Sequence, residues 1–216
     1  MKKLLLASLL ALPCMNTFAD NHNFSLSLNL VSDRLLRGFS LTDENPSNIA
    51  GLHYDHGSGF YAKAVNFTNI QITGDDGEVL TDAVIGRTFA FDQFALDAGY
   101  IHHYFSETNE AESGEWFVGT IVDNYKLHYY RNNKLEEHYL DFNYGYPIAD
   151  GYQLLLHAGR LTSDVNSAMN FSDYSVGVVS QLNDFQIGLT FAYNDNEEAL
   201  RDVAGSHVVF NISTVW

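Results

Sequence analysis

The C-terminal segment alternates between two faces and ends on an aromatic residue. Large, mostly apolar side chains occupy one of these faces: Val208, Phe210, Ile212, Thr214 and Trp216. A period of two indicates a strand. A terminal strand with an apolar outer face and a closing aromatic residue is typical of bacterial outer-membrane barrels, in which it pairs with the first strand and faces lipid. The pattern therefore favours a transmembrane barrel over a soluble sheet protein.

The first 19 residues have the features of a secretory signal peptide. A short basic region, Met1-Lys2-Lys3, precedes an apolar stretch over residues 4–13 that is too short to span a bilayer as a helix. Small residues at Thr17 and Ala19 predict cleavage after Ala19. We therefore expect a signal peptide over residues 1–19 and one mature domain over residues 20–216, exported to the bacterial outer membrane.

Composition narrows the choice of partners. The only cysteine, Cys14, lies in the expected signal peptide, and Pro13 before it disfavours a lipoprotein. Without Lys2 and Lys3, nine basic side chains stand against 27 acidic ones, a formal net charge of −18. Binding to nucleic acid needs a basic surface, so nucleic acid is excluded as an expected partner.

The body of the chain consists of short alternating segments joined by two kinds of connection. We expect strands at residues 24–40, 49–56, 60–72, 78–91, 94–105, 115–122, 125–131, 135–146, 152–160, 171–182, 185–193 and 206–216. Every second connection is tight and carries Gly, Asn or Asp, as hairpin turns require. The others are mostly longer and acidic. This sorting predicts an all-β fold, an antiparallel transmembrane β-barrel of about twelve strands with both termini on the periplasmic side.

The residues expected to face the lumen favour two different interiors. Aromatic side chains at Phe117, Tyr130 and Tyr139 favour a barrel filled by its own side chains. Small residues of the same parity favour an open pore: Gly99, Gly119, Gly145, Gly177 and Gly188. A barrel of this size lies between filled small barrels and open porins, so both interiors stay open at this point.

One motif near the N-terminus resembles a known family. It reads Ser32-Asp33-Arg34-Leu35-Leu36-Arg37-Gly38-Phe39-Ser40 and is followed by Gly51-Leu52-His53-Tyr54 and Gly59-Phe60-Tyr61-Ala62. The motif resembles the TorF porin family, also called the Gcw-chp family of proteobacterial outer-membrane proteins, with Arg34 and Leu36 at two positions that are aromatic in the family. The resemblance implies an outer-membrane barrel and allows for a pore. It supplies no catalytic residue, cofactor or established substrate.

Four charged residues are expected to line the lumen: Asp33, Arg37, Glu137 and Asp141. Residues four apart on a strand are roughly 13 Å apart, so Asp33 and Arg37 should each meet a charge on a neighbouring strand rather than each other. They are candidates for a constriction that selects solutes by charge. The alternative is a structural ion pair that fills a narrow barrel.

Acidic side chains gather in the longer connections. The candidate cluster consists of Asp75, Asp76, Glu107, Glu110 and Glu112. Such a cluster concentrates cations at a pore mouth or binds the divalent ions that bridge lipopolysaccharide. The alternative is a set of solvated loop tips. Outer-membrane lipid and lipopolysaccharide are the expected surroundings of the barrel, and the oligomeric state is left open.

No metal site or catalytic group is expected. His102 and His103 are successive strand residues and point to opposite faces. His128 and His138 are candidates for a same-face pair, but two histidines without a third ligand do not predict a metal site. No spacing of Ser, His and Asp singles out a triad. We therefore expect no enzyme activity and no cofactor.

The sequence favours a porin that lets small hydrophilic solutes diffuse through it, biased toward cations by its acidic mouth. A structural or adhesive outer-membrane barrel with a filled lumen is the main alternative. A soluble periplasmic β-sandwich is the third interpretation, and the sorting of turns and loops disfavours it.

Overall fold

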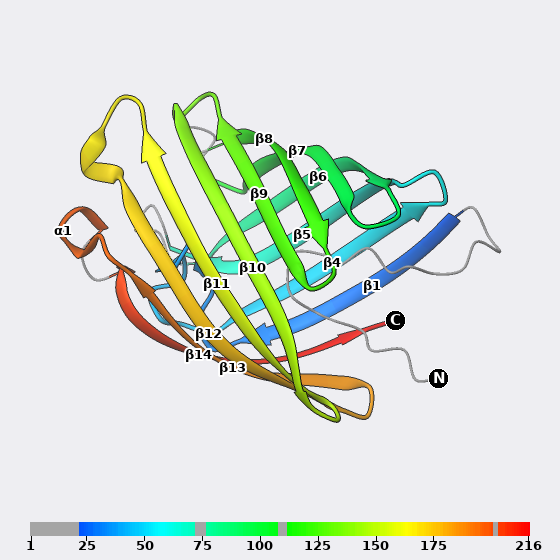
Figure 1. The fold of residues 1–216 in the computed structure, drawn as a ribbon. Coiled ribbons are helices and arrows are strands. Elements are labelled where there is room, and N and C mark those ends of the chain that lie inside the picture. Colours follow the sequence, from blue (N-terminus) through cyan, green and yellow to red (C-terminus); the bar gives the residue numbers. More distant parts are fainter. Residues whose placement is uncertain (1–21, 72–76, 108–111, 201–202) are drawn as a thin grey trace.

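The computed structural model describes residues 22–71, 77–107, 112–200 and 203–216. Twelve long antiparallel strands close into a barrel (Figure 1). They are β1 (His22–Val31), β4 (Ser47–His56), β5 (Phe60–Ile70), β6 (Glu78–Ala90), β7 (Ala95–Phe105), β8 (Ser113–Val122), β9 (Tyr125–Asn132), β10 (Glu137–Ala149), β11 (Tyr152–Ser163), β12 (Phe171–Leu182), β13 (Phe185–Asn194) and β14 (Gly205–Val215). The predicted fold class and strand number are confirmed, whereas the expected signal peptide lies outside the described residues.

The barrel closes between its first and last strands. β1 pairs with β4 on one side and with β14 on the other, so Leu28 faces Ala50 and Thr214 across the two ladders. Trp216 continues this pairing: its N–H donates to the carbonyl of Leu26 at 2.9 Å, and its carbonyl accepts from the Leu26 N–H at 2.9 Å. Closure leaves no strand of the barrel wall with an unpaired edge, which is what a sheet inside a membrane requires.

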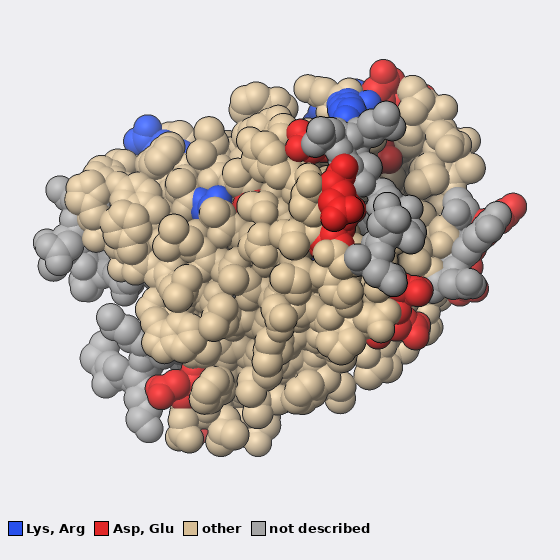
Figure 2. Space-filling model, turned by 180° about the vertical axis from the view of Figure 1, so that it is seen from behind, with Lys and Arg blue, Asp and Glu red and all other residues tan. Residues whose placement is uncertain are grey.

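The outer face of the wall is apolar and the inner face is largely polar. Phe24 is 67% exposed on the outside, whereas Asn29 on the opposite face of the same strand is 7% exposed. The middle of the wall seen in Figure 2 has few charged side chains, and acidic side chains gather toward one end. This distribution of polar and apolar side chains is the inverse of that in a soluble barrel, because the outer face contacts lipid and not water.

The connections are sorted between the two ends of the barrel. Short turns join the strands at one end, the turn end, where Asp123 and Asn183 adopt positive φ angles of 48° and 55°. The longer connections lie at the other end, the loop end, toward the upper left of Figure 1. The loop end also holds the short 3-10 helix η1 (Ser167–Met169) and helix α1 (Glu197–Leu200). Within the described ranges, no helix is long and apolar enough to cross a membrane.

The first strand is shorter than the sequence predicts. Residues 24–40 were expected to form one strand, but β1 ends at Val31 and the chain then leaves the wall. Residues 32–46, which we call the inner loop, carry a small hairpin formed by β2 (Leu35–Leu36) and β3 (Phe39–Ser40). Its two-residue turn is Arg37-Gly38, with φ angles of 50° and 76°. Positive φ at both central residues is the mark of a type I′ hairpin turn, and this turn ends the continuous strand that alternation alone predicts.

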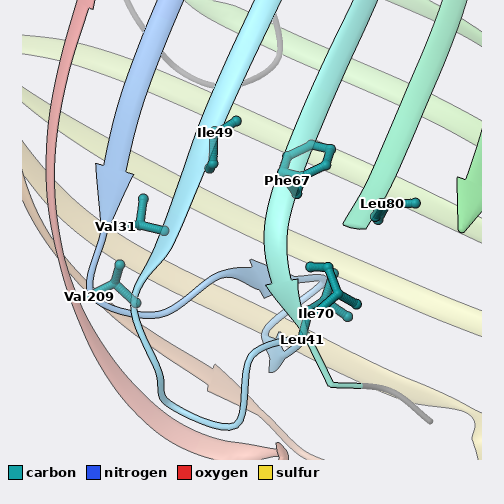
Figure 3. Packing of buried hydrophobic residues seen from close by; sticks show 7 residues of the cluster. All are labelled: Val31, Leu41, Ile49, Phe67, Ile70, Leu80 and Val209. Atoms are coloured by element: carbon teal, nitrogen blue, oxygen red, sulfur yellow. The ribbon is translucent and has the colours of Figure 1, made fainter. Parts of the chain in front are cut away.

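An apolar cluster attaches the inner loop to the inside of the barrel (Figure 3). Leu41 of the loop is 2% exposed, and its backbone also accepts a hydrogen bond from the N–H of Gln71 at 2.8 Å. The cluster combines Leu41 with wall residues of five strands: Val31, Ile49, Phe67, Ile70, Leu80 and Val209. Burying a leucine side chain in this way contributes about 1.5–3 kcal/mol to folding.

Candidate functional site

The inner loop is organised around the carboxylate of Asp33. The hydroxyls of Ser40 and Thr42 donate to Asp33 Oδ1 at 2.6 and 2.9 Å. The Arg34 N–H in turn donates to Thr42 Oγ1 at 3.1 Å. The second Asp33 oxygen lies 3.3 Å from His207 Nδ1 on β14. Asp33 is 5% exposed, so this carboxylate holds the loop in shape and ties it to the wall.

Arg37 reaches across the lumen from the tip of the hairpin. Its Nη2 donates to both carboxylate oxygens of Glu115 on β8, at 2.7 and 2.8 Å. Its guanidinium lies over the ring of Tyr139 on β10, 4.3 Å from the ring centroid. Its backbone carbonyl accepts a hydrogen bond from Asn194 Nδ2 on β13 at 2.9 Å. These three strands lie on different sides of the barrel, so the hairpin crosses the lumen at the loop end.

Glu115 and Tyr139 keep the Arg37 guanidinium charged in this confined position. Burial alone lowers the pKa of Arg37, but the nearby Glu115 carboxylate outweighs it and raises that pKa above its ordinary value. Glu115 also lies 4.0 Å from His103 Nε2, and His103 Nδ1 is 2.6 Å from Asp82. A permanent positive charge therefore stands among carboxylates where the hairpin crosses the lumen.

Gly38 permits the hairpin to come this close to the wall. A Cβ added to Gly38 would lie 2.7 Å from Asp173 Cβ on β12, which is closer than two carbon atoms can approach. The φ of +76° at Gly38 is also one that glycine adopts without strain. The fit of the hairpin inside the barrel therefore depends on this residue.

The structure brings the sequence-predicted lumen residues to the inside by two routes. Asp33 and Arg37 reach it through the inner loop and do not pair with each other. Asp33 lies against His207 on β14, a neighbour of β1, whereas Arg37 meets Glu115 on β8 across the lumen and not the expected charge on a neighbouring strand. Asp141 faces inward from β10, is 3% exposed, and lies 3.1 Å from His157 Nδ1. Glu137 begins β10 at the loop end, opposite Asn132. Of the predicted loop cluster, Glu107 is exposed and Glu112 half-buried, while Asp75, Asp76 and Glu110 lie outside the described residues.

Sequence reasoning missed the partner of Arg37. Glu115 was placed at the start of an expected strand but was not among the predicted lumen residues, and it faces the lumen from β8 and is 5% exposed. The available signal was its parity with Phe117, which was already expected to point inward. Extending that parity from Phe117 to Glu115, two residues earlier on the same strand, would have suggested Glu115 as a counter-charge.

Two inward-facing histidines in the middle of the wall lie against carboxylates. His128 on β9 is 3.2 Å from Asp97, and His157 on β11 is 2.6 Å from Asp173. The Tyr139 hydroxyl donates to Asp173 at 3.0 Å. These contacts line the wall with paired polar groups and leave it rich in carboxylates.

His128 and His138, the candidates for a same-face pair, lie on opposite faces of the wall. His128 faces the lumen, whereas His138 lies on the outer face, where it contacts Arg131 and lies 3.1 Å from Asp164. In the part of the chain that the structure describes, no group of three or more His, Cys, Asp or Glu side chains converges to hold a metal ion.

The chain matches a family of bacterial proteins over nearly its whole length. The match spans residues 16–214, and the family is described as a bacterial protein of unknown function, Gcw_chp. The chain belongs to the Gcw_chp family. The match is to this family as a whole rather than to the narrower TorF name. No curated protein matches the chain.

Solved structures with a similar fold are outer-membrane porins and related barrels. The KdgM porin superimposes with a TM-score of 0.62 at 10% sequence identity, covering 88% of this chain and 98% of KdgM. The NanC porin gives 0.55 at 11% identity, covering 89% and 98%. The outer-membrane protein Omp33 of Acinetobacter baumannii gives 0.52 at 8% identity, covering 89% and 97%. The Gcw_chp chain therefore shares the barrel fold of these outer-membrane proteins.

Proposed function

We propose that this protein is a narrow outer-membrane porin that lets small hydrophilic solutes diffuse through it. One observation carries the proposal: a closed barrel with an apolar outside holds a polar, charged interior that the inner loop narrows at the loop end. A polar interior behind a lipid-facing wall is what a water-filled channel requires. The inner loop then acts as the constriction, with Arg37 and Glu115 at its centre, and the loop end faces the cell exterior in a membrane that contains lipopolysaccharide.

The interior charge favours cations. Among the inward-facing wall residues, carboxylates outnumber lysines and arginines. The basic ones include Lys63 and Lys126, and the acidic ones include Asp55, Glu78, Asp82, Asp97, Glu115, Glu137, Asp141 and Asp173. A channel lined by carboxylates attracts cations and repels anions. KdgM has been solved in complex with oligogalacturonate, an acidic saccharide, and an interior of this charge is not suited to such a solute.

A structural barrel with a filled lumen is the second candidate function. The inner loop and the buried rings of Phe117, Tyr130 and Tyr139 favour it, because Phe39 of the loop packs against the cluster that these rings form inside the barrel. In that case the Arg37–Glu115 contact anchors the inner loop to the barrel wall.

Liposome swelling separates the two candidates. Liposomes containing the refolded barrel are diluted into isotonic solutions of uncharged solutes of increasing size. A porin of this kind gives swelling with the smallest solutes and a steep fall with size, because the inner loop sets the cut-off. Liposomes that swell no faster than protein-free ones, with the barrel correctly folded, would establish the filled structural barrel instead.

A further inference from the structure

The two faces of the barrel wall carry charges of different sign. In the twelve described wall strands, each Asp and Glu has lumen-facing parity, and Glu115 and Asp141, for example, are 5% and 3% exposed. The opposite face carries arginines, because Arg87 on β6, Arg131 on β9 and Arg160 on β11 lie in register with outward-facing neighbours. The lipid-facing side of the described strands is therefore positive where arginine occurs on it, whereas their carboxylates line the lumen.

Two of these arginines lie near each other at the loop end. Arg131 lies opposite His138 on β10, and Arg160 lies opposite Leu140, two residues further along the same strand. β9, β10 and β11 are consecutive strands of the wall (Figure 1). The two strands that carry the arginines are therefore roughly 10 Å apart, within the combined reach of two arginine side chains. We call Arg131, His138 and Arg160 the outer basic patch.

The outer basic patch is accessible from outside the barrel. Arg160 is exposed, and the side chains of Arg131 and His138 are 27% and 30% exposed. Arg160 Nη1 donates to Ser172 Oγ at 2.9 Å, which occupies one of the several N–H donors of the guanidinium. Arg131 Nη1 donates to Asp164 Oδ2 at 2.8 Å, and the Asp164 side chain is 50% exposed. An ion pair this exposed contributes little to stability, so an incoming anion can replace Asp164.

Aromatic side chains place the outer basic patch at the boundary of the membrane. Trp116 on β8 lies opposite Arg131 and is 59% exposed. Tyr129, two residues before Arg131 on the same face, is 39% exposed, and Tyr174, two residues after the partner of Arg160 on β12, is 51% exposed. Outward-facing Trp and Tyr side chains form girdles at the level of the lipid headgroups. The patch therefore lies at the depth of the headgroups of one leaflet.

The chemistry of the outer basic patch suits phosphate. The guanidinium presents its donors in a fixed fork that matches the oxygens of a phosphate group. The wall beside the patch is apolar, and Leu140, next to Arg160, is 47% exposed. An occupant that meets both surfaces joins an anionic headgroup to hydrocarbon chains. Such a molecule is an anionic lipid rather than a dissolved ion.

We propose that the outer basic patch binds the phosphate groups of lipopolysaccharide, whose acyl chains then lie along the apolar wall beside it. Asp164 holds the Arg131 guanidinium in place until a phosphate replaces it. The site requires the barrel to lie in the outer membrane with its loop end outward, but it does not require an open lumen. It therefore stands or fails independently of conduction.

Thermal unfolding with added lipid tests the outer basic patch. The refolded barrel in detergent is titrated with diphosphorylated lipid A, the lipid part of lipopolysaccharide, and unfolding is followed by the loss of faster migration on an unheated denaturing gel. A ligand that binds the folded barrel alone raises the unfolding temperature. In the double variant Arg131→Gln with Arg160→Gln, the lipid concentration for the half-maximal shift should rise at least about tenfold.

Two further variants control for charge and for folding. Arg87→Gln is the matched control, because Arg87 is an exposed arginine of the same face near the turn end, opposite Phe60. It should titrate like the unchanged protein. Asp164→Asn disrupts the same ion pair as Arg131→Gln but keeps both arginines, so it should bind the lipid at least as tightly as the unchanged protein. Weakening of equal size in Arg87→Gln or in Asp164→Asn would overturn the phosphate contact.

Changing the added molecule identifies the group that is bound. Dephosphorylated lipid A, inorganic phosphate and phosphatidylglycerol should each need much higher concentrations than diphosphorylated lipid A to give the same shift. An equal shift with dephosphorylated lipid A would overturn the phosphate contact, and one with inorganic phosphate would make the patch a site for the free ion. An equal shift with phosphatidylglycerol would overturn the choice of lipopolysaccharide. No shift at all in the unchanged protein would overturn the proposal, whether or not the same preparation conducts ions.

Discussion

At the scale of single residues, the contact between Arg37 and Glu115 determines whether the inner loop stays seated. Their charged atoms are 2.7 Å apart and their side chains are 12% and 6% exposed. Removing one partner leaves a confined charge unpaired, so Arg37→Ala and Glu115→Ala should each lower the free energy of unfolding by about 3 kcal/mol. The double variant should lose clearly less than the sum of the two, in urea unfolding followed by tryptophan fluorescence. Simple additivity of the two losses would mean that the pair does not interact.

The charge of Arg37 also has a consequence for transport. Arg37 carries a positive charge at the constriction, and replacing it with methionine removes this charge but keeps much of the packing on Tyr139. Arg37→Met should therefore shift the reversal potential in a salt gradient toward stronger cation preference. A reversal potential equal to that of the unchanged protein would place Arg37 outside the conduction path.

Gly38 gives a steric test of how closely the hairpin fits. Gly38→Val would place a side chain against Asp173 and also strain a φ of +76°, so the hairpin should be displaced and the conductance should rise. Gly77→Val is the control, because Gly77 has a φ of +93° with nothing within 4 Å of an added Cβ. The control should strain the backbone without changing the conductance; equal effects of the two substitutions would contradict a close fit at Gly38.

The residue scale also marks the limit of reasoning from sequence. Parity placed Asp33 and Arg37 on the lumen side, yet they reach the lumen through a loop and not along a strand. The alternation of side chains in the sequence continues past Val31, so it predicted a longer first strand. The Arg37-Gly38 turn was not recognised because it lacks the Asn-Gly or Asp-Gly signal of a type I′ hairpin. The contact with Glu115 joins residues 78 positions apart, which no local pattern can encode.

At the scale of elements, the inner loop is the feature that narrows the barrel. Replacing residues 35–40 with two glycines removes β2, β3 and the Arg37 crossing while leaving the wall strands intact. The conductance should rise several-fold, because the loop no longer fills the loop end. Shortening residues 165–169, which include η1 and the exposed Val165, is the control and should leave the conductance unchanged. An unchanged conductance after excision of the hairpin would show that the narrow part lies elsewhere.

Element boundaries were largely accessible from sequence because turn chemistry is local. The turns at 123–124 and 183–184 lie where Asp and Asn predict them. β10 extends to Ala149 rather than ending at residue 146, and the register shifts between Pro147 and Ala149. Proline cannot donate to the ladder, and the structure accommodates Pro147 at this irregularity.

At the scale of the whole molecule, closure between β1 and β14 sets the stability of the barrel. The paired hydrogen bonds of Trp216 with Leu26 extend this seam by one residue beyond β14. Deleting Trp216 should lower the temperature at which the folded barrel loses its faster migration on an unheated denaturing gel. Trp216→Phe keeps the backbone pairing and should lose less. Identical melting of all three proteins would mean that the seam does not depend on its last pair.

The central claim is tested most directly by single-channel recording of the unmodified, refolded barrel in a planar bilayer with a salt gradient across it. The account predicts small, stepwise conductance and a reversal potential of the sign given by cation preference, since carboxylates outnumber fixed positive charges along the wall. A folded barrel that inserts without any conductance, or that conducts with anion preference, would contradict it.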